Sequence, residues 1–138
     1  MRVSQRLDYS VRLLVALARQ PAGAFTGSGE LADRLGLPRR FLELQMSTLK
    51  SAGLVRCRRG AGGGCALARN AAAITVADIV RAVEGSVLDV PKTQASATAE
   101  AWSRASIALE AELDSISIAE LAARQAALDA EIAPIYFI

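Results

Sequence analysis

The first part of the chain carries apolar residues at the three-to-four-residue spacing of amphipathic helices. This pattern predicts helices over residues 4–20, 29–35 and 38–52. Ser4 and Ser28 stand where the N-caps of the first two helices would be. The third helix would turn one face toward the other two and leave the opposite face exposed. The residues expected on its inward face are Leu42, Met46 and Leu49.

The pattern changes after the third helix. Two short segments in 54–68 surround the run 60–64, in which four of five residues are glycine, and this predicts a β-hairpin with a flexible tip. Thr75 and Asp78 then have the spacing of a capping box, which predicts a helix that ends at Gly85. Three helices followed by a hairpin form a winged helix-turn-helix. We therefore predict a mainly α fold with a small β-hairpin wing.

The remainder of the chain differs in composition. We interpret 86–97 as a linker or sensor loop, and Ser117–Glu120 as the start of a final helix. The long helix between them has one apolar stripe, which is too narrow for a fully buried helix and suits a two-fold partner. We therefore predict a DNA-binding domain over 1–85 and dimerisation helices over 98–138. Alternatively, Trp102 in this stripe could line a pocket for a small effector. The stripe consists of Trp102, Leu109, Leu113 and Ile116.

The formal net charge of +2 hides an uneven distribution. Up to Asp89 the chain has 13 Lys and Arg residues against 7 Asp and Glu, whereas from Val90 onward it has 3 against 7. Between Arg34 and Arg69 there are eight basic residues, and the only acid is Glu43. A basic segment joined to an acidic one is typical of a polyanion-binding part next to a part with another task. The basic residues lie on the third helix and the hairpin, which points to double-stranded DNA.

The exposed face of the third helix supplies the first candidate contacts. A recognition helix enters the major groove N-terminus first, so Arg39 and Arg40 would meet base edges and phosphates. Glu43 could accept a hydrogen bond from cytosine, or it could pair with Arg39 four residues earlier. The candidates on this helix are Arg39, Arg40, Glu43 and Ser47 for the major groove and Lys50 for a phosphate.

The hairpin supplies the second set of candidate contacts. Arg59 precedes the glycine-rich tip and would enter a narrow, electronegative minor groove, where Gly60 and Gly62 allow close approach of the backbone. Arg56 and Arg58 are candidates for phosphate contacts. A solvated basic turn is the plainer alternative. A nucleotide-binding phosphate loop is disfavoured because no Gly-Lys-Ser/Thr follows the glycines.

Short motifs spread over nearly the whole chain occur together. They are Tyr9, Leu31-Ala32 with Leu35-Gly36, Phe41-Leu42-Glu43, 49–55, Arg59 with 60–64, 74–79 with Glu84-Gly85, and Trp102 with 115–121. With these motifs the sequence resembles the bacterial winged-helix regulators that include IscR, NsrR and CymR. The resemblance implies a homodimer, joined through its long C-terminal helix, that binds operator DNA as a repressor or activator. We expect a repressor that reads a pseudo-palindromic operator.

The sequence also departs from that family. Its cluster-binding members carry three cysteines in the loop before the long helix, and the segment 86–102 contains none. We therefore expect no cofactor and no metal, unless an alanine such as Ala95 or Ala101 replaces a cysteine. Leu44 stands where the family often has glutamine, so the family's operator preference is not carried over.

The two cysteines, Cys57 and Cys65, lie at equal distances from Ala61. A symmetric hairpin would place them opposite each other, close to the separation that a disulfide needs. One hypothesis is a redox switch that changes operator affinity. The plainer interpretation is two small strand residues.

Other classes of protein fit less well. The chain has no histidine, the commonest general base and metal ligand, so we expect no enzyme. No run approaches the roughly 18 apolar residues of a membrane span, and two cysteines without a signal peptide indicate the cytoplasm. The expected partners are DNA, a second copy and a small-molecule or protein effector. The alternative function is an adaptor that regulates by binding a partner protein instead of DNA.

Overall fold

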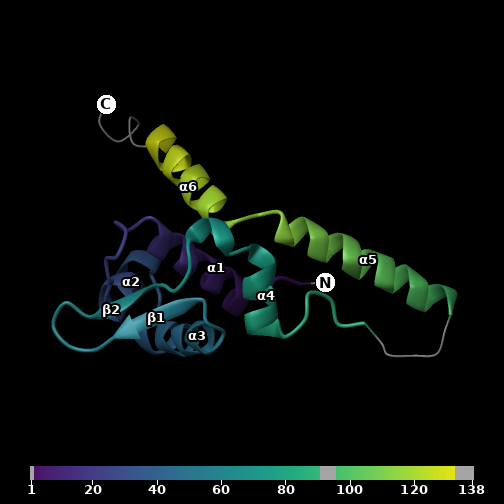
Figure 1. Cartoon of the computed structure of the whole chain (residues 1–138), viewed down its shortest axis with the longest axis horizontal. Helices are drawn as coiled ribbons and strands as arrows, with labels where there is room; N and C mark the ends of the chain where they lie inside the picture. Colours follow the sequence, from purple (N-terminus) through teal and green to yellow (C-terminus); the bar gives the residue numbers. More distant parts are fainter. Residues whose placement is uncertain (1, 91–95, 133–138) are drawn as a thin grey trace.

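A computed structural model of the protein describes residues 2–90 and 96–132, and in these residues six α-helices, one 3-10 helix and two strands follow one another (Figure 1). The predicted mainly α fold with a hairpin wing is confirmed. The N-terminal elements are α1 (Gln5–Ala18), α2 (Ser28–Leu35), α3 (Arg39–Ser51), β1 (Val55–Arg58) and β2 (Gly64–Leu67). The C-terminal elements are η1 (Ala71–Ala73), α4 (Val76–Glu84), α5 (Ala97–Asp114) and α6 (Ile118–Ile132).

The first four helices enclose one hydrophobic core, which we call the core of the head. Leu42, Met46 and Leu49 are buried in it, as their helical spacing predicts. Gln45 is also buried, which the apolar pattern did not predict. The neighbouring Ser10 hydroxyl donates a 2.8 Å hydrogen bond to a backbone carbonyl one turn earlier in α1. The same hydroxyl lies 3.5 Å from the Gln45 side-chain oxygen, which gives a buried polar contact between α1 and α3.

Local capping explains where several helices begin. The Ser4 side chain accepts a hydrogen bond of 3.0 Å from Leu7 N at the start of α1. Thr75 and Asp78 form the reciprocal capping box of α4. The prediction of Ser28 as a cap is wrong, because α2 begins at that residue and the preceding glycine is the N-cap. The extended backbone just before α2 is held by a strand contact, and that contact sets the first helical residue.

That strand contact involves Thr26 and broadens the base of the wing. Thr26 N–H donates to the Cys65 carbonyl at 2.9 Å, and Cys65 N–H donates to the Thr26 carbonyl at 2.8 Å. On its other side Cys65 faces Cys57 of β1 in the antiparallel register. Gly64 has a φ of +134°, and a Cβ there would collide with the Thr26 carbonyl. Only glycine allows this close approach, so Gly64 is a structural requirement of the wing.

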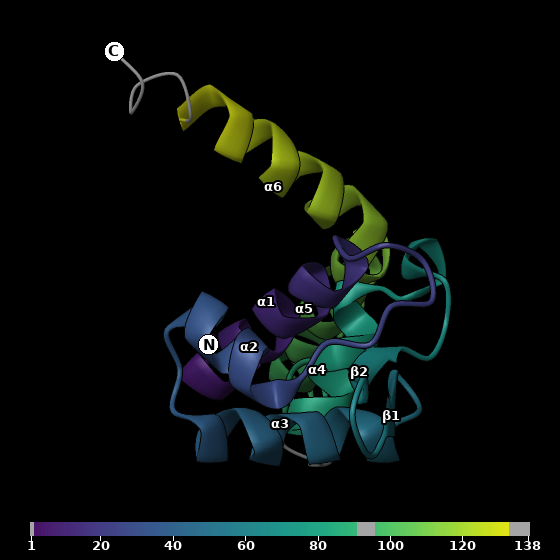
Figure 2. The ribbon, with the colours of Figure 1, turned by 90° about the vertical axis from the view of Figure 1, so that its left-hand side faces the viewer.

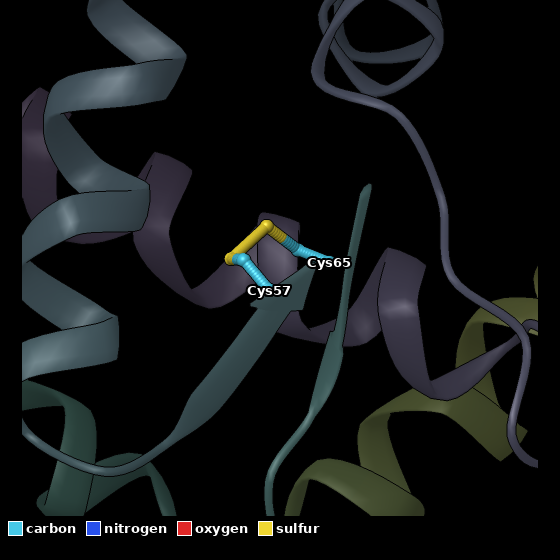
Figure 3. The surroundings of a disulfide bond; sticks show 2 residues. All are labelled: Cys57 and Cys65. Atoms are coloured by element: carbon cyan, nitrogen blue, oxygen red, sulfur yellow. A yellow bond between two sulfur atoms is a disulfide. The ribbon is translucent and has the colours of Figure 1, made fainter. Parts of the chain in front are cut away.

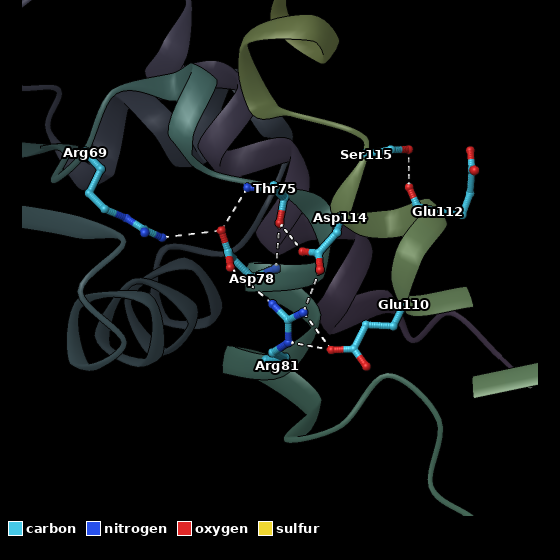
Figure 4. Close-up of polar contacts among 8 residues, drawn as sticks. All are labelled: Arg69, Thr75, Asp78, Arg81, Glu110, Glu112, Asp114 and Ser115. Carbon is cyan, nitrogen blue, oxygen red and sulfur yellow. Dashed lines mark hydrogen bonds and ion pairs between the residues drawn. The ribbon is translucent and has the colours of Figure 1, made fainter. Parts of the chain in front are cut away.

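Helix α5 extends away from the head as an arm, and its C-terminal part packs against α4 (Figure 1). Arg81 of α4 makes this contact. Its guanidinium donates to Glu110 at 2.7 and 3.1 Å and to Asp114 at 3.0 Å, and it also bonds Asp78 on its own helix (Figure 4). The hydrogen bonds that Arg81 donates to Glu110 and Asp114 raise its pKa above its usual range.

The chain then returns to the head before α6. Helix α5 ends at Asp114, so the prediction that Ile116 continues its apolar stripe is wrong. The Ile116 carbonyl instead accepts a hydrogen bond of 2.9 Å from Val76 N, and Ile118 N donates to the Ile74 carbonyl at 2.8 Å. The Ile118 side chain is fully buried in the core of the head. These two backbone bonds hold the link between α5 and α6 against the head.

Helix α6 lies along α1, where the Arg19 guanidinium pairs with the Asp129 carboxylate at 2.6 Å. The Gln125 amide and Arg19 lower the pKa of that carboxyl. Across 2–90 and 96–132, no helix has the length and apolar character needed to cross a bilayer.

Candidate nucleic-acid interface

Helix α3 and the hairpin lie on the side of the head opposite α6 (Figures 1 and 2). The face of α3 that points away from the core carries all five of the α3 residues that the sequence analysis proposed as contacts. All of them are exposed, and Leu44 beside them is exposed as well. These residues are Arg39, Arg40, Glu43, Ser47 and Lys50. The core side chains of the same helix keep this face turned outward.

Glu43 pairs with Arg39, at 3.1 Å from the guanidinium Nε to a carboxylate oxygen. In the DNA-free protein the ion-pair alternative for Glu43 is therefore the one observed. Both side chains are more than half exposed, and such an i,i+4 pair contributes only about 0.3–0.5 kcal/mol. A charge-assisted bond from Arg39 to a guanine or phosphate would readily replace it. Among the described residues, no ion pair occupies Arg40, Lys50 or Arg59.

The arginines of β1 are positioned by Phe25, a residue that the sequence analysis missed. The guanidinium of Arg58 lies 4.2 Å and that of Arg56 5.2 Å from the centre of the Phe25 ring. Residues two apart on a strand share a face, so both side chains reach the same ring. A cation–π contact at an exposed site stabilises by about 0.5–1 kcal/mol and reduces the freedom of long side chains. The aromatic ring therefore holds two cations at the base of the wing.

The tip of the wing leaves Arg59 exposed. Gly60 and Gly62 have φ values of +92° and +73°, with open space where a side chain would stand. The Arg58 guanidinium donates a 3.2 Å hydrogen bond to the Gly62 carbonyl, and Gly63 N donates to the Gly60 carbonyl at 2.9 Å. Two hydrogen bonds thus close the tip, and glycines follow directly after the exposed Arg59.

Cys57 and Cys65 lie opposite each other on β1 and β2, as a symmetric hairpin requires, and their sulfur atoms are joined in a disulfide (Figure 3). The Cα atoms of the pair are 4.1 Å apart. Cys65 belongs to the core of the head, whereas Cys57 is only half-buried. The bond lies between the buried base of the wing and its exposed tip.

The residues proposed for dimerisation differ in their surroundings. Trp102 is 53% exposed near the start of α5, and Ile107 on the same helix is 69% exposed, although the sequence analysis did not select Ile107. Leu109 is half-buried, and Leu113 packs against the core of the head. The two exposed apolar residues of α5, Trp102 and Ile107, therefore both lie N-terminal to Glu110, where the helix is bonded to α4.

Comparison with known proteins shows close relatives. A family model described as "Rrf2: Iron-dependent Transcriptional regulator" matches residues 3–124. The HTH-type transcriptional regulator CymR of Bacillus subtilis (strain 168) is 33% identical over 124 residues, which cover 88% of this chain and 90% of CymR. The solved structure of CymR, the global cysteine regulator of B. subtilis, superposes with a TM-score of 0.79 at 32% identity, covering 90% of this chain and 98% of that chain. IscR of T. potens superposes with a TM-score of 0.74 at 33% identity, covering 88% and 85%.

The exposed face of α3, the basic wing and these relatives together define a winged-helix, DNA-binding transcription regulator. The chain belongs to the Rrf2 family.

The family's description names iron, which raises the question of whether this chain has side chains that could bind an iron–sulfur cluster. The whole sequence has two cysteines and no histidine, and both cysteines lie in the wing, bonded to each other. Within 2–90 and 96–132 no three His, Cys, Asp or Glu side chains form a metal-binding group. These donors do not fit an iron–sulfur cluster, which is held mainly by cysteine thiolates.

Proposed function

We propose that this protein is a homodimeric repressor that reads a pseudo-palindromic operator with two copies of α3 and of the wing. One observation supports this most strongly. The α3 face and the wing arginines lie together on one side of the head, while the exposed apolar residues Trp102 and Ile107 lie on an arm outside that surface. Dimerisation through α5 would therefore leave the reading surface of each head free.

In this proposal each α3 enters the major groove, and the two copies lie about 34–36 Å apart, one helical turn of DNA. Arg39 and Arg40 approach base edges and phosphates from the N-terminal end of the helix. Ser47 lies further along the same exposed face. Arg39 exchanges its contact with Glu43 for one with DNA, since the ion pair is weak. Lys50 contacts a phosphate.

The wing would reach the flanking minor groove. Arg59 enters it, and the open backbone at Gly60 and Gly62 allows the tip to approach the groove floor. Arg56 and Arg58, held by the Phe25 ring, contact phosphates on the groove edge. The protein would act in the cytoplasm, where chromosomal DNA is found.

The donor set supports regulation without an iron–sulfur cluster, so the signal would be a small molecule, a partner protein or a change at the wing cysteines. The protein-only adaptor, the alternative function, is disfavoured by membership of a DNA-binding family. It would be supported if no duplex showed sequence preference as salt is raised, because a DNA reader keeps its preference when non-specific contacts weaken.

Two single variants test the proposed contacts on a duplex that the protein selects from a random library. Arg59→Ala should weaken binding and reduce the preference for sequences with a narrow minor groove. Lys50→Ala should weaken binding to all duplexes equally and lower the slope of log affinity against log salt by about one unit. Unchanged affinity of Arg59→Ala would refute the placement of the wing in the minor groove.

The dimer is tested by sedimentation velocity over a range of concentrations. The double variant Trp102→Ser, Ile107→Ser should dissociate at concentrations where the wild-type protein is a dimer, because two exposed apolar side chains no longer favour association. Lys50→Ala serves as the control, since Lys50 lies on the opposite functional surface. A wild-type protein that is monomeric at all concentrations would refute the homodimer.

A further inference from the structure

We propose that Cys57 and Cys65 form a reversible redox site that sets operator affinity, with the oxidised wing binding more tightly than the reduced wing. The inference rests on the proposed DNA-reading function and adds a chemical signal to it. The pair lies inside the candidate interface itself, between the buried strand β2 and the arginine-bearing strand β1.

The position of the bond determines what it can control. It joins residues eight positions apart and closes a ring around the tip of the wing. Arg58, Arg59, Gly60 and Gly62, four of the proposed contacts, lie within that ring. A change at the sulfur atoms therefore acts directly on proposed DNA contacts, with no need for a signal to pass through the head.

Apart from the disulfide, few interactions order the tip of the wing. The ring contains four glycines, which have the largest conformational freedom of any residue. Inside it, the Gly63–Gly60 backbone bond and the Arg58–Gly62 bond act together with the pairing of two four-residue strands. Short two-stranded hairpins are marginally stable in water. A covalent cross-link at the base restricts the positions that Arg59 can sample before it meets DNA.

The disulfide also links strand β1 to strand β2, which is held in place by the head. Cys65 is buried and held on its far side by both backbone bonds to Thr26. Its amide and carbonyl point to Thr26, so the sulfur bridge is the direct tie between Cys65 and Cys57. Through this tie, the firmly held β2 restrains β1 and the two arginines that lie over Phe25. Loss of the bond leaves only the backbone pairing of the flanking residues to restrain β1 against β2.

The chemistry requires an oxidant, and a peroxide is sufficient. The more exposed Cys57 thiol loses its proton, and the thiolate attacks one oxygen of hydrogen peroxide. The O–O bond breaks, a sulfenic acid forms, and the departing hydroxide takes up that proton and leaves as water. The Cys65 thiol then attacks that sulfur, the disulfide forms, and a second water leaves, so two thiols have lost two electrons to one peroxide. A dithiol reverses the step by attack on Cys57 sulfur with Cys65 leaving as thiolate. In the reducing cytoplasm, disulfides are usually transient and often serve as redox sensors.

The test compares one preparation in two redox states on the library-selected duplex. Protein oxidised with hydrogen peroxide should bind with a dissociation constant about three- to tenfold lower than protein reduced with dithiothreitol. The Cys57→Ser, Cys65→Ser variant should match the reduced protein in both buffers. Equal affinity of the two wild-type states, or a redox response that persists in the double variant, would overturn the proposal.

A second measurement without DNA separates this inference from the proposed function. Trypsin should cut after Arg59 more slowly in oxidised than in reduced wild-type protein, and at one common rate in the double variant. Equal rates in the two wild-type states would overturn the restraint on the wing. Absence of binding to every duplex, together with a redox-dependent cleavage rate, would refute the DNA-reading function while confirming the redox site.

Discussion

Gly64 offers a sharp test of how the wing is joined to the head. Alanine at this position would bring a Cβ against the Thr26 carbonyl, and its backbone would keep an unfavourable φ of +134°. Relief of the clash requires the segment around Thr26 to move away from β2, which removes both hydrogen bonds between Thr26 and Cys65. Each such bond contributes about 1 kcal/mol, and the backbone strain adds roughly 1–3 kcal/mol. We expect Gly64→Ala to lower the free energy of unfolding by about 3–5 kcal/mol.

Gly62→Ala is the matched control in the same wing. Gly62 also has a positive φ, of +73°, but nothing lies within 4 Å of the position its Cβ would occupy. Its substitution should cost only the conformational penalty, about 1–2 kcal/mol. Urea unfolding followed by circular dichroism, at one protein concentration for all variants, measures both changes. If the two variants lost the same stability to within about 0.5 kcal/mol, the close contact between Gly64 and Thr26 would not exist in solution.

Three further predictions concern the attachment of the helices. Ile118→Ala should destabilise the protein by about 2–5 kcal/mol in urea unfolding, because a fully buried side chain is lost; a change below 0.5 kcal/mol would contradict its place in the core. Arg81→Gln should increase hydrogen exchange of amides in the C-terminal half of α5, and unchanged exchange would show that its ion pairs do not hold α5. The Ser4 hydroxyl and then Arg6 lower the pKa of Glu84, so its contribution is present above the unfolded pKa near 4.5 and lost as pH falls through the lower folded value. The stability difference between wild type and Glu84→Gln should therefore vanish in acid, and a constant difference from pH 7 to pH 2 would refute this.

The parts of the fold that local chemistry controls could be predicted from the sequence. The capping box of Thr75 and Asp78, the cap at Ser4 and the glycine-rich turn each have a signature within a few residues, and the structure confirms all three. The exposed face of α3 was predictable for the same reason, because Leu42, Met46 and Leu49 define the opposite face by their spacing.

The parts that depend on distant residues could not be predicted. Ser28 has the right chemistry for a cap, but the pairing of Thr26 with Cys65 sets where the helix begins. Ile116 keeps the helical spacing, yet its carbonyl is bound by Val76 after the helix has ended. The contact between Phe25 and the β1 arginines crosses two segments about thirty residues apart, and a single aromatic residue carries no pattern to reveal it.

The attachment of α5 has a mechanical consequence. At 1.5 Å per residue, its 18 residues form a rod about 27 Å long. The rod is clamped near one end, by Arg81 and by the backbone bonds at Ile116 and Ile118, while Trp102 lies toward the other. A tilt of about 5° at the clamp would move the far end by about 2 Å. In the proposed homodimer the helix would thus act as a lever, which converts a small shift of α4 into a larger displacement of the far end of α5.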